Sequence, residues 1–404
     1  MDRRAFLTRS AALGCSLAAS PLVTPMSFAA APGEGRLVVI LLRGGMDGLA
    51  TVMPHGDPGF AALRPAPDFE TDLDLGGGYA LAGALGGLAP LWQAGQLGVV
   101  HAVSTPYRDK RSHFDGQDLL EAGGGDPRRG LPRDGWLNRL VQSLPGATAQ
   151  TAYAVGHDPL AILGGAAEVQ RWAPESDLAL SPQAIRLAGR VMQDDPAMAA
   201  ALQAALRLAD GDGDAVAVPG GEAAMMDAMM QDMTAARGGG HHARLAGFAA
   251  DRLREEARIA SFSLNGWDTH ANQARGLNRA LGVLAETITA LRDGLGGPVW
   301  RHTAVVAVTE FGRTVRLNGS GGTDHGTGGA MLLAGGAIRG GRVVTDWPGL
   351  AEADLYDRRD LRPTRDLRAH LGWLIRGLYG IDRATIERVV FPGLEMGRDP
   401  GLLL

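Results

Sequence analysis

Short apolar segments, separated by longer stretches of mixed composition, most constrain how this chain folds. Six of them are expected to be strands, at residues 37–42, 97–102, 152–155, 259–264, 303–308 and 331–334. Continuous apolar runs are typical of strands buried on both faces of a parallel sheet. Leu277, Leu281, Leu284 and Ile288 recur at helical spacing, which predicts an amphipathic helix over residues 274–294. Strands that alternate with helices predict an α/β fold, in which a mainly parallel sheet is sandwiched between helices.

The N-terminus carries the pattern of an export signal. Arg3 and Arg4 precede Ala5-Phe6-Leu7, a weakly apolar run spans residues 11–23, and small residues surround Ser27-Phe28-Ala29. This order predicts a twin-arginine signal peptide over residues 1–29 and a periplasmic or secreted protein; the alternative is a chance arginine pair. The run is too short to cross a membrane, and no later segment reaches about 18 apolar residues, so no transmembrane segment is expected in the mature chain.

Composition limits the domain organisation and the kinds of site that this chain can form. We expect residues 30–404 to form one domain, with a helical insertion rich in Ala and Met at about 194–250. The net charge of −5 argues against nucleic-acid binding. Lys110 is the only lysine and lacks the preceding glycines of a phosphate-binding loop. Cys15, the single cysteine, lies in the signal, so disulfides, thiolate metal sites and a cysteine nucleophile are excluded from the mature chain.

Polar side chains follow the first two long strands, where ligands bind in open α/β sheets. Asp47 comes after the first strand, and its carboxylate suits either a metal ligand or a helix cap. Ser112 and Asp115 have the spacing of a capping box. A serine at a helix N-terminus is also well placed as an ester nucleophile, because N–H groups there stabilise negative charge. Ser112 and its neighbour His113 are therefore candidate catalytic residues.

Further candidates follow the later strands. Asp268 and His270 are two residues apart and share one side of an extended segment, which suits a shared metal ion; an N-cap and a surface histidine are the alternative. Glu310 is a further candidate ligand, and Arg313 a candidate clamp for an anionic group, unless the two form a simple ion pair. Asp324 and His325 lie among the many glycines of residues 319–329, which predicts close backbone approach to a ligand or a loop around a metal.

Several of these stretches together resemble a known family. They are residues 42–48, 111–115, 135–139, 267–273, 310–314 and 322–329. The set resembles the domain-of-unknown-function 1501 family of exported bacterial proteins, which looks like a distant branch of the alkaline phosphatase and sulfatase superfamily. The resemblance implies a sheet between helices and one or two divalent ions (zinc, manganese or calcium). It also implies ligand roles for Asp47, Asp268, His270 and His325.

This sequence also departs from the pattern of the superfamily. Glu310-Phe311 stands where the superfamily commonly has Asp-His, which removes an imidazole ligand from a second metal site. The function expected from the intact motifs is metal-dependent hydrolysis of phosphate or sulfate esters, on a small molecule or a glycan. The alternative, which the departure favours, is a non-catalytic periplasmic or cell-surface binding protein on the same fold.

Overall fold

The computed structural model describes residues 34–64, 71–108, 110–125, 130–173 and 240–404. Nine of the strands in these residues form one sheet, in the order β11-β5-β10-β9-β1-β8-β6-β7, with β12 also paired to β5. Their bounds are β1 Arg36–Arg43, β5 Leu97–Ser104, β6 Ala152–Val155, β7 Gln170–Trp172, β8 Ile259–Asn265, β9 Thr303–Val308, β10 Gly329–Ala334, β11 Arg342–Val344 and β12 Arg365–Asp366. All six predicted strands are confirmed.

The sheet is mainly parallel, as expected, but β10 is not. Strand β1 pairs in parallel with β8 on one side and β9 on the other, whereas β10 runs antiparallel to both β9 and β5. A parallel neighbour requires a long crossover, usually a helix. The chain between β9 and β10, residues 309–328, contains no helix and returns directly, so β10 runs antiparallel to β9.

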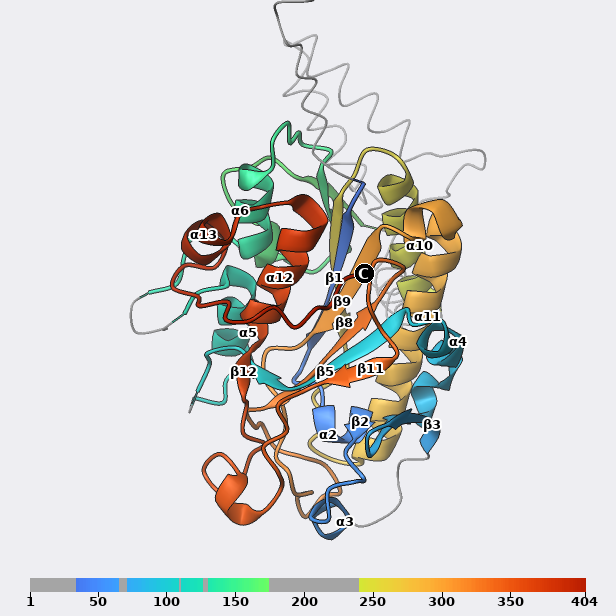
Figure 1. The fold of residues 1–404 in the computed structure, drawn as a ribbon, viewed down its shortest axis with the longest axis vertical. Coiled ribbons are helices and arrows are strands. Elements are labelled where there is room, and N and C mark those ends of the chain that lie inside the picture. Colours follow the sequence, from blue (N-terminus) through green and yellow to red (C-terminus); the bar gives the residue numbers. More distant parts are fainter. Residues whose placement is uncertain (1–33, 65–70, 109, 126–129, 174–239) are drawn as a thin grey trace, which may run out of the picture.

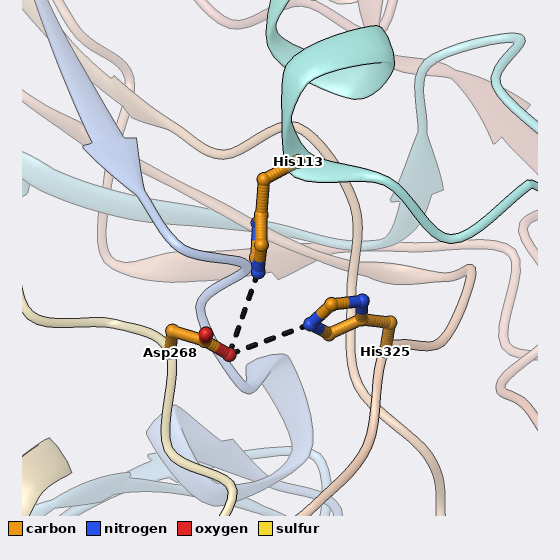
Figure 2. A group of neighbouring side chains, drawn as sticks. All are labelled: His113, Asp268 and His325. Atoms are coloured by element: carbon orange, nitrogen blue, oxygen red, sulfur yellow. Dashed lines mark ion pairs between the residues drawn. The ribbon is translucent and has the colours of Figure 1, made fainter.

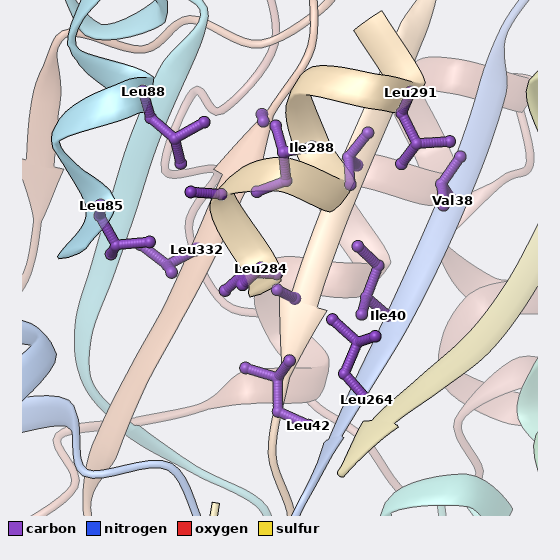
Figure 3. Close-up of a cluster of buried hydrophobic side chains, with 14 of the residues drawn as sticks. Val38, Ile40, Leu42, Leu85, Leu88, Leu264, Leu284, Ile288, Leu291 and Leu332 are labelled. Carbon is purple, nitrogen blue, oxygen red and sulfur yellow. The ribbon is translucent and has the colours of Figure 1, made fainter. Parts of the chain in front are cut away.

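Helices cover both faces of this sheet (Figure 1). On one face η1 (Gly83–Leu88), α4 (Ala89–Gln93), α10 (His241–Arg254) and α11 (Gln273–Trp300) pack on Val38, Ile40 and Leu42. On the other face α6 (Trp136–Ser143), α12 (Leu367–Tyr379) and η5 (Ile386–Val390) pack on Leu37, Val39 and Leu41. Because side chains alternate along a strand, the apolar run of β1 buries three residues in each of two cores. Figure 3 shows the first core, where Leu284, Ile288 and Leu291 of α11 lie over the sheet.

The predicted amphipathic helix is confirmed and is longer than expected. It extends to Trp300, past a kink at Gly296 (φ 68°) and Pro298. The predicted insertion lies largely outside the described residues; its last part, residues 241–250, belongs to α10, which packs on α11. The predicted signal peptide, residues 1–29, also lies outside them. Among the helices that the structure describes, none has the length and apolar character needed to cross a membrane.

The remaining elements are short. A second sheet contains β2 (Val52–Met53), β4 (Tyr79–Ala82) and β3 (Thr71–Gly76), in that order. The short helices are α2 Gly48–Thr51, α3 Phe60–Leu63, η3 Ala161–Leu163, η4 Glu352–Asp354 and α13 Arg383–Thr385. Helix α5, His113–Ala122, begins close to the carboxyl ends of β1, β8 and β9 and carries the first residue of the candidate site.

Candidate metal centre

Three segments far apart in the sequence meet at the carboxyl end of the sheet (Figure 2). Asp268 follows β8, His325 lies in the loop between β9 and β10, and His113 is the first residue of α5. One ligand atom of each residue lies within 4.8 Å of those of the other two. Strands β8 and β9 are the two neighbours of β1, so the loops that follow them converge over its end.

The oxygen Oδ1 of Asp268 is the centre of the group. It lies 3.4 Å from Nε2 of His113, 3.4 Å from Nε2 of His325 and 3.1 Å from Nε2 of His270. The Nε2 atoms of His270 and His325 are 2.9 Å apart. His270 therefore contacts two members of the group, Asp268 and His325, and the predicted convergence of Asp268, His270 and His325 is what the structure shows.

The other ring nitrogen of each histidine faces an oxygen that cannot donate a hydrogen. Nδ1 of His113 lies 2.7 Å from Oε1 of Glu310, and Nδ1 of His325 lies 2.7 Å from the carbonyl oxygen of Arg111. Nδ1 of His270 lies 3.3 Å from Oδ1 of Asp324. An ionised carboxylate and a carbonyl only accept, so Nδ1 of each ring carries the proton. In the neutral rings Nε2 then presents a lone pair toward Asp268.

Lone pairs that face a carboxylate oxygen repel it unless a positive charge lies between them. Nε2 of His113 is buried and has no hydrogen-bond partner among the described residues. Zinc binds imidazole nitrogen and carboxylate oxygen at about 2.0–2.2 Å, and tetrahedral ligands at that distance are about 3.3–3.6 Å apart. The two 3.4 Å separations match this value. The donor set of His113, Asp268 and His325 therefore fits a divalent cation.

Arg313 holds Asp268 in place. Its guanidinium is fully buried, and Nη2 donates to Oδ1 of Asp268 at 2.5 Å. The same group donates to the backbone carbonyls of Gly44, Gly45, Trp267 and Thr323. Arg313 thus ties together the loops after β1 and β8, and it is not placed as the clamp for a substrate anion that the sequence suggested.

Aromatic rings pack against two of the histidines. Phe311 is buried and its ring centroid lies 5.0 Å from that of His113 and 5.1 Å from that of His325. Tyr107 stacks on Phe311, and its hydroxyl accepts a hydrogen bond from the backbone N–H of Ser112 at 2.7 Å. The position where the resemblance implies another imidazole ligand is therefore occupied by an apolar support for two histidines.

The glycines around His325 allow backbones to touch. A Cβ atom on Gly322 would lie 2.2 Å from the carbonyl carbon of His270, and one on Gly326 would lie 2.3 Å from the carbonyl carbon of Arg313. Real Cβ atoms do not approach backbone so closely, so any other residue at these positions would push the loop away. The glycines therefore allow close contact with other backbone segments, whereas close approach to a ligand or a metal stays a prediction.

Glu310 and Asp324 contact the histidines at Nδ1, the ring nitrogen that faces away from Asp268. Glu310 is buried, and its carboxylate accepts hydrogen bonds from His113, the backbone N–H of Gly44, Gln117 and Thr309. Asp324 accepts from Nδ1 of His270 and from Asn318. Both carboxylates, expected as ligands, therefore contact the ring nitrogen that faces away from Asp268, which is where the partners of metal-binding histidines lie. Conversely His113, expected to be catalytic, offers a ligand atom.

Asp47 and Ser112 both take the capping alternative. Oδ1 of Asp47 accepts from the backbone N–H groups of Leu49 and Ala50, and Oδ2 pairs with Arg64 at 2.8 Å and accepts from Gln273 at 2.6 Å. Asp47 is therefore not brought into the ligand group. Oγ of Ser112 accepts from the N–H of Asp115 at 3.4 Å, which makes it the N-cap of α5.

Ionisation in the site follows from these contacts. The hydrogen bond to Glu310 raises the pKa of His113 above its ordinary value, whereas burial lowers the pKa of His325. Burial raises the pKa of Asp268, but the hydrogen bond and charge of Arg313 outweigh it, so the pKa lies below its ordinary value. Burial acts in the same direction on Glu310, where the bond from His113 and further hydrogen bonds outweigh it and lower the pKa.

Comparison with solved structures finds similar arrangements at low identity. A protein in the alkaline phosphatase superfamily from Vibrio parahaemolyticus is 11% identical, with 90% of this chain and 71% of that chain covered and a TM-score of 0.38. Ps i-CgsB is 11% identical, with 86% and 72% covered and a TM-score of 0.37. Phosphonoacetate hydrolase from Sinorhizobium meliloti 1021 is 13% identical, with 69% and 56% covered and a TM-score of 0.25.

No curated protein matches the chain. A family model described as "Protein of unknown function (DUF1501)" matches residues 101–373, which include His113, Asp268 and His325. Because this match spans more than half of the chain, the protein belongs to the DUF1501 family.

Proposed function

We propose that this protein is an exported, metal-dependent hydrolase of phosphate or sulfate esters, whose divalent cation is bound by His113, Asp268 and His325. The observation that carries the proposal is the direction of the histidines. Nδ1 of each lies 2.7 Å from an acceptor, so in the neutral ring Nε2 presents its lone pair toward Oδ1 of Asp268 at 3.4 Å. Imidazoles and a carboxylate are a ligand set found in catalytic zinc sites.

The donor set also bears on which ion binds. Calcium prefers six to eight oxygen ligands, and two nitrogen donors suit zinc or manganese better. A second ion would need carboxylates that are already engaged, since Glu310 and Asp324 each hold a histidine. We therefore propose one zinc or manganese ion rather than two ions or calcium.

The protein's own groups prepare the site for an anion. A bound divalent cation supplies Lewis-acid activation of a water or an ester oxygen. Arg313 keeps Asp268 ionised, and Glu310 fixes the ring of His113. The carbonyl oxygen of Arg111, 2.7 Å from Nδ1 of His325, fixes the second ring in the same way. Helix α5 begins at His113, so the positive end of its dipole faces the centre. This end of the helix favours a phosphate or sulfate group beside the cation.

The test combines metal analysis with turnover. We expect the purified protein to bind about one equivalent of zinc or manganese and to hydrolyse an aryl phosphate or an aryl sulfate. Asp268→Asn and His325→Ala should lose both metal and turnover. Asp293→Asn, which changes an exposed carboxylate on α11, is the matched control and should lose neither. Stoichiometric metal in Asp268→Asn would contradict the proposed centre.

A non-catalytic binding protein is the second candidate. It is favoured by Ser112, whose Oγ caps α5, and by Arg313, whose guanidinium is fully engaged. The outcome that selects this candidate is stoichiometric metal in the wild type without turnover of either ester, together with metal-dependent binding of sulfate or phosphate.

Export is proposed from Arg3 and Arg4 and from the small residues near Ala29. Changing both arginines to lysine should hold the precursor in the cytoplasm, because the twin-arginine pathway requires the pair. Fractionation of cells that express each form measures this. Normal appearance of the double variant in the periplasm would overturn the assignment.

A further inference from the structure

A cavity of about 340 Å³ lies at the β11 and β12 edge of the large sheet, away from the candidate metal centre. Strand β11 pairs with residues 98–100 of β5 and β12 pairs with residues 103–104, so His101 and Ala102 lie between them. Hydroxyls fill this gap, because Thr345 and Thr364 donate to the carbonyl oxygens of His101 and Ala102, each at 3.2 Å. Their oxygen lone pairs remain available as acceptors.

One buried side chain of the cavity wall is left unsatisfied. His370 of α12 lines the cavity and is 2% exposed, and its Nδ1 has no hydrogen-bond partner among the described residues. Burial, together with the charge of Arg365, lowers the pKa of His370 to about 3, so the ring is neutral. Buried polar atoms are nearly always paired, so the unpaired Nδ1 is a departure that a bound water or ion, or local strain, would explain.

The cavity wall carries charges of both signs. Arg365 and Arg398 line the cavity together with Asp346 and Asp399. Both carboxylates act on the guanidinium of Arg365, which also donates to the carbonyl of Met396 at 2.9 Å. An ion entering the cavity would therefore meet charges of both signs rather than only the opposite charge.

We propose that this cavity is a binding site for a neutral, hydroxyl-rich molecule of monosaccharide size. Carboxylate oxygens accept from hydroxyl groups and guanidinium N–H groups donate to them, so a wall with both is complementary to neighbouring hydroxyls, each of which does both. Val344, which is only partly buried, supplies apolar surface for the carbon face of a ring. Small-molecule sites occupy about 300–1,000 Å³, and this cavity is at the small end of that range. The proposal does not depend on the metal centre.

The test titrates the full chain with D-glucose, D-galactose and myo-inositol by saturation-transfer NMR and calorimetry. At least one should bind with a dissociation constant on the order of millimolar, as expected for a ligand with so few atoms. His370→Phe and Asp346→Asn should each weaken binding about tenfold or more. Asp293→Asn, and the metal-site variant Asp268→Asn, should leave it unchanged. Asp346 is exposed, so its variant is expected to fold even if His370→Phe does not.

Three results would overturn the proposal. One is the absence of binding by all three probes at tens of millimolar. Another is binding that survives both His370→Phe and Asp346→Asn, since the ligand would then lie elsewhere. The last is preferential binding of inorganic phosphate or glycine that Asp346→Asn alters, which would make the cavity a site for ions.

Discussion

Replacing Glu310 with glutamine tests whether a buried carboxylate prepares His113 to bind metal. Glu310 is 1% exposed, and its Oε1 accepts the proton of Nδ1 of His113 at 2.7 Å. A glutamine side chain accepts this proton only when its carbonyl oxygen faces the ring, and it carries no charge in either orientation. With its NH₂ group toward the ring, the proton of His113 moves to Nε2 and blocks the lone pair that faces Asp268.

The expected magnitude follows from the role of such partners. Losing the group behind a metal-bound histidine typically weakens metal affinity 10–100-fold, which corresponds to about 1.4–2.7 kcal/mol. The bonds from Gly44 and Thr309 also weaken, so we expect unfolding to become easier by roughly 1–3 kcal/mol. Competition for zinc with a chromophoric chelator measures the first effect, and chemical denaturation measures the second.

The chain offers a matched control for this variant. Glu121 is also a buried carboxylate (4% exposed), and it pairs with Arg43 at 2.9 Å and accepts from the backbone N–H of Ile162. Glu121→Gln should lower stability without changing metal affinity, because no histidine of the centre contacts it. Wild-type zinc affinity in Glu310→Gln, or an equal loss in Glu121→Gln, would refute the reasoning.

Three further outcomes are expected. Ser112→Ala should lower the free energy of unfolding by about 0.5–1 kcal/mol while metal binding and any ester turnover persist, because the cap bond is long; turnover lost with metal retained would make Ser112 a nucleophile instead. Arg313→Lys should lower the free energy of unfolding by roughly 3–5 kcal/mol, since an ammonium group does not reach all the acceptors that the Arg313 guanidinium binds. An unchanged denaturation midpoint would contradict this. Burial lowers the pKa of His101 to about 4, so between pH 6.5 and pH 4 the unfolded chain binds a proton that the folded chain does not. The free energy of unfolding therefore decreases as the pH is lowered through this window, by about 3 kcal/mol at pH 4. Denaturation midpoints against pH measure this loss, which His101→Gln should reduce and which is absent if the ring stays solvated.

Much of the architecture is local information that a sequence carries. Buried strands such as 37–42 and 303–308 are apolar throughout, because both faces of a covered sheet exclude water. The leucines from 277 to 295 recur at helical spacing, because one stripe of α11 packs on the sheet. The convergence of Asp268, His270 and His325 was predictable for a related reason, since polar residues after parallel strands share one edge of the sheet.

The roles of individual side chains depended on tertiary structure. The direction of β10 followed from a loop without a helix, which no local pattern marked. Glu310, expected as a ligand, instead accepts the proton of Nδ1 of His113, because which end of an imidazole meets a carboxylate depends on how α5 is set against the loop after β9. The sequence suggested Arg313 as a clamp for an anionic group or a partner of Glu310, but burial forces its guanidinium to bond the carbonyls that surround it. Periodicity and spacing determine which residues come together, whereas the partner that each polar atom finds is decided only when distant segments pack.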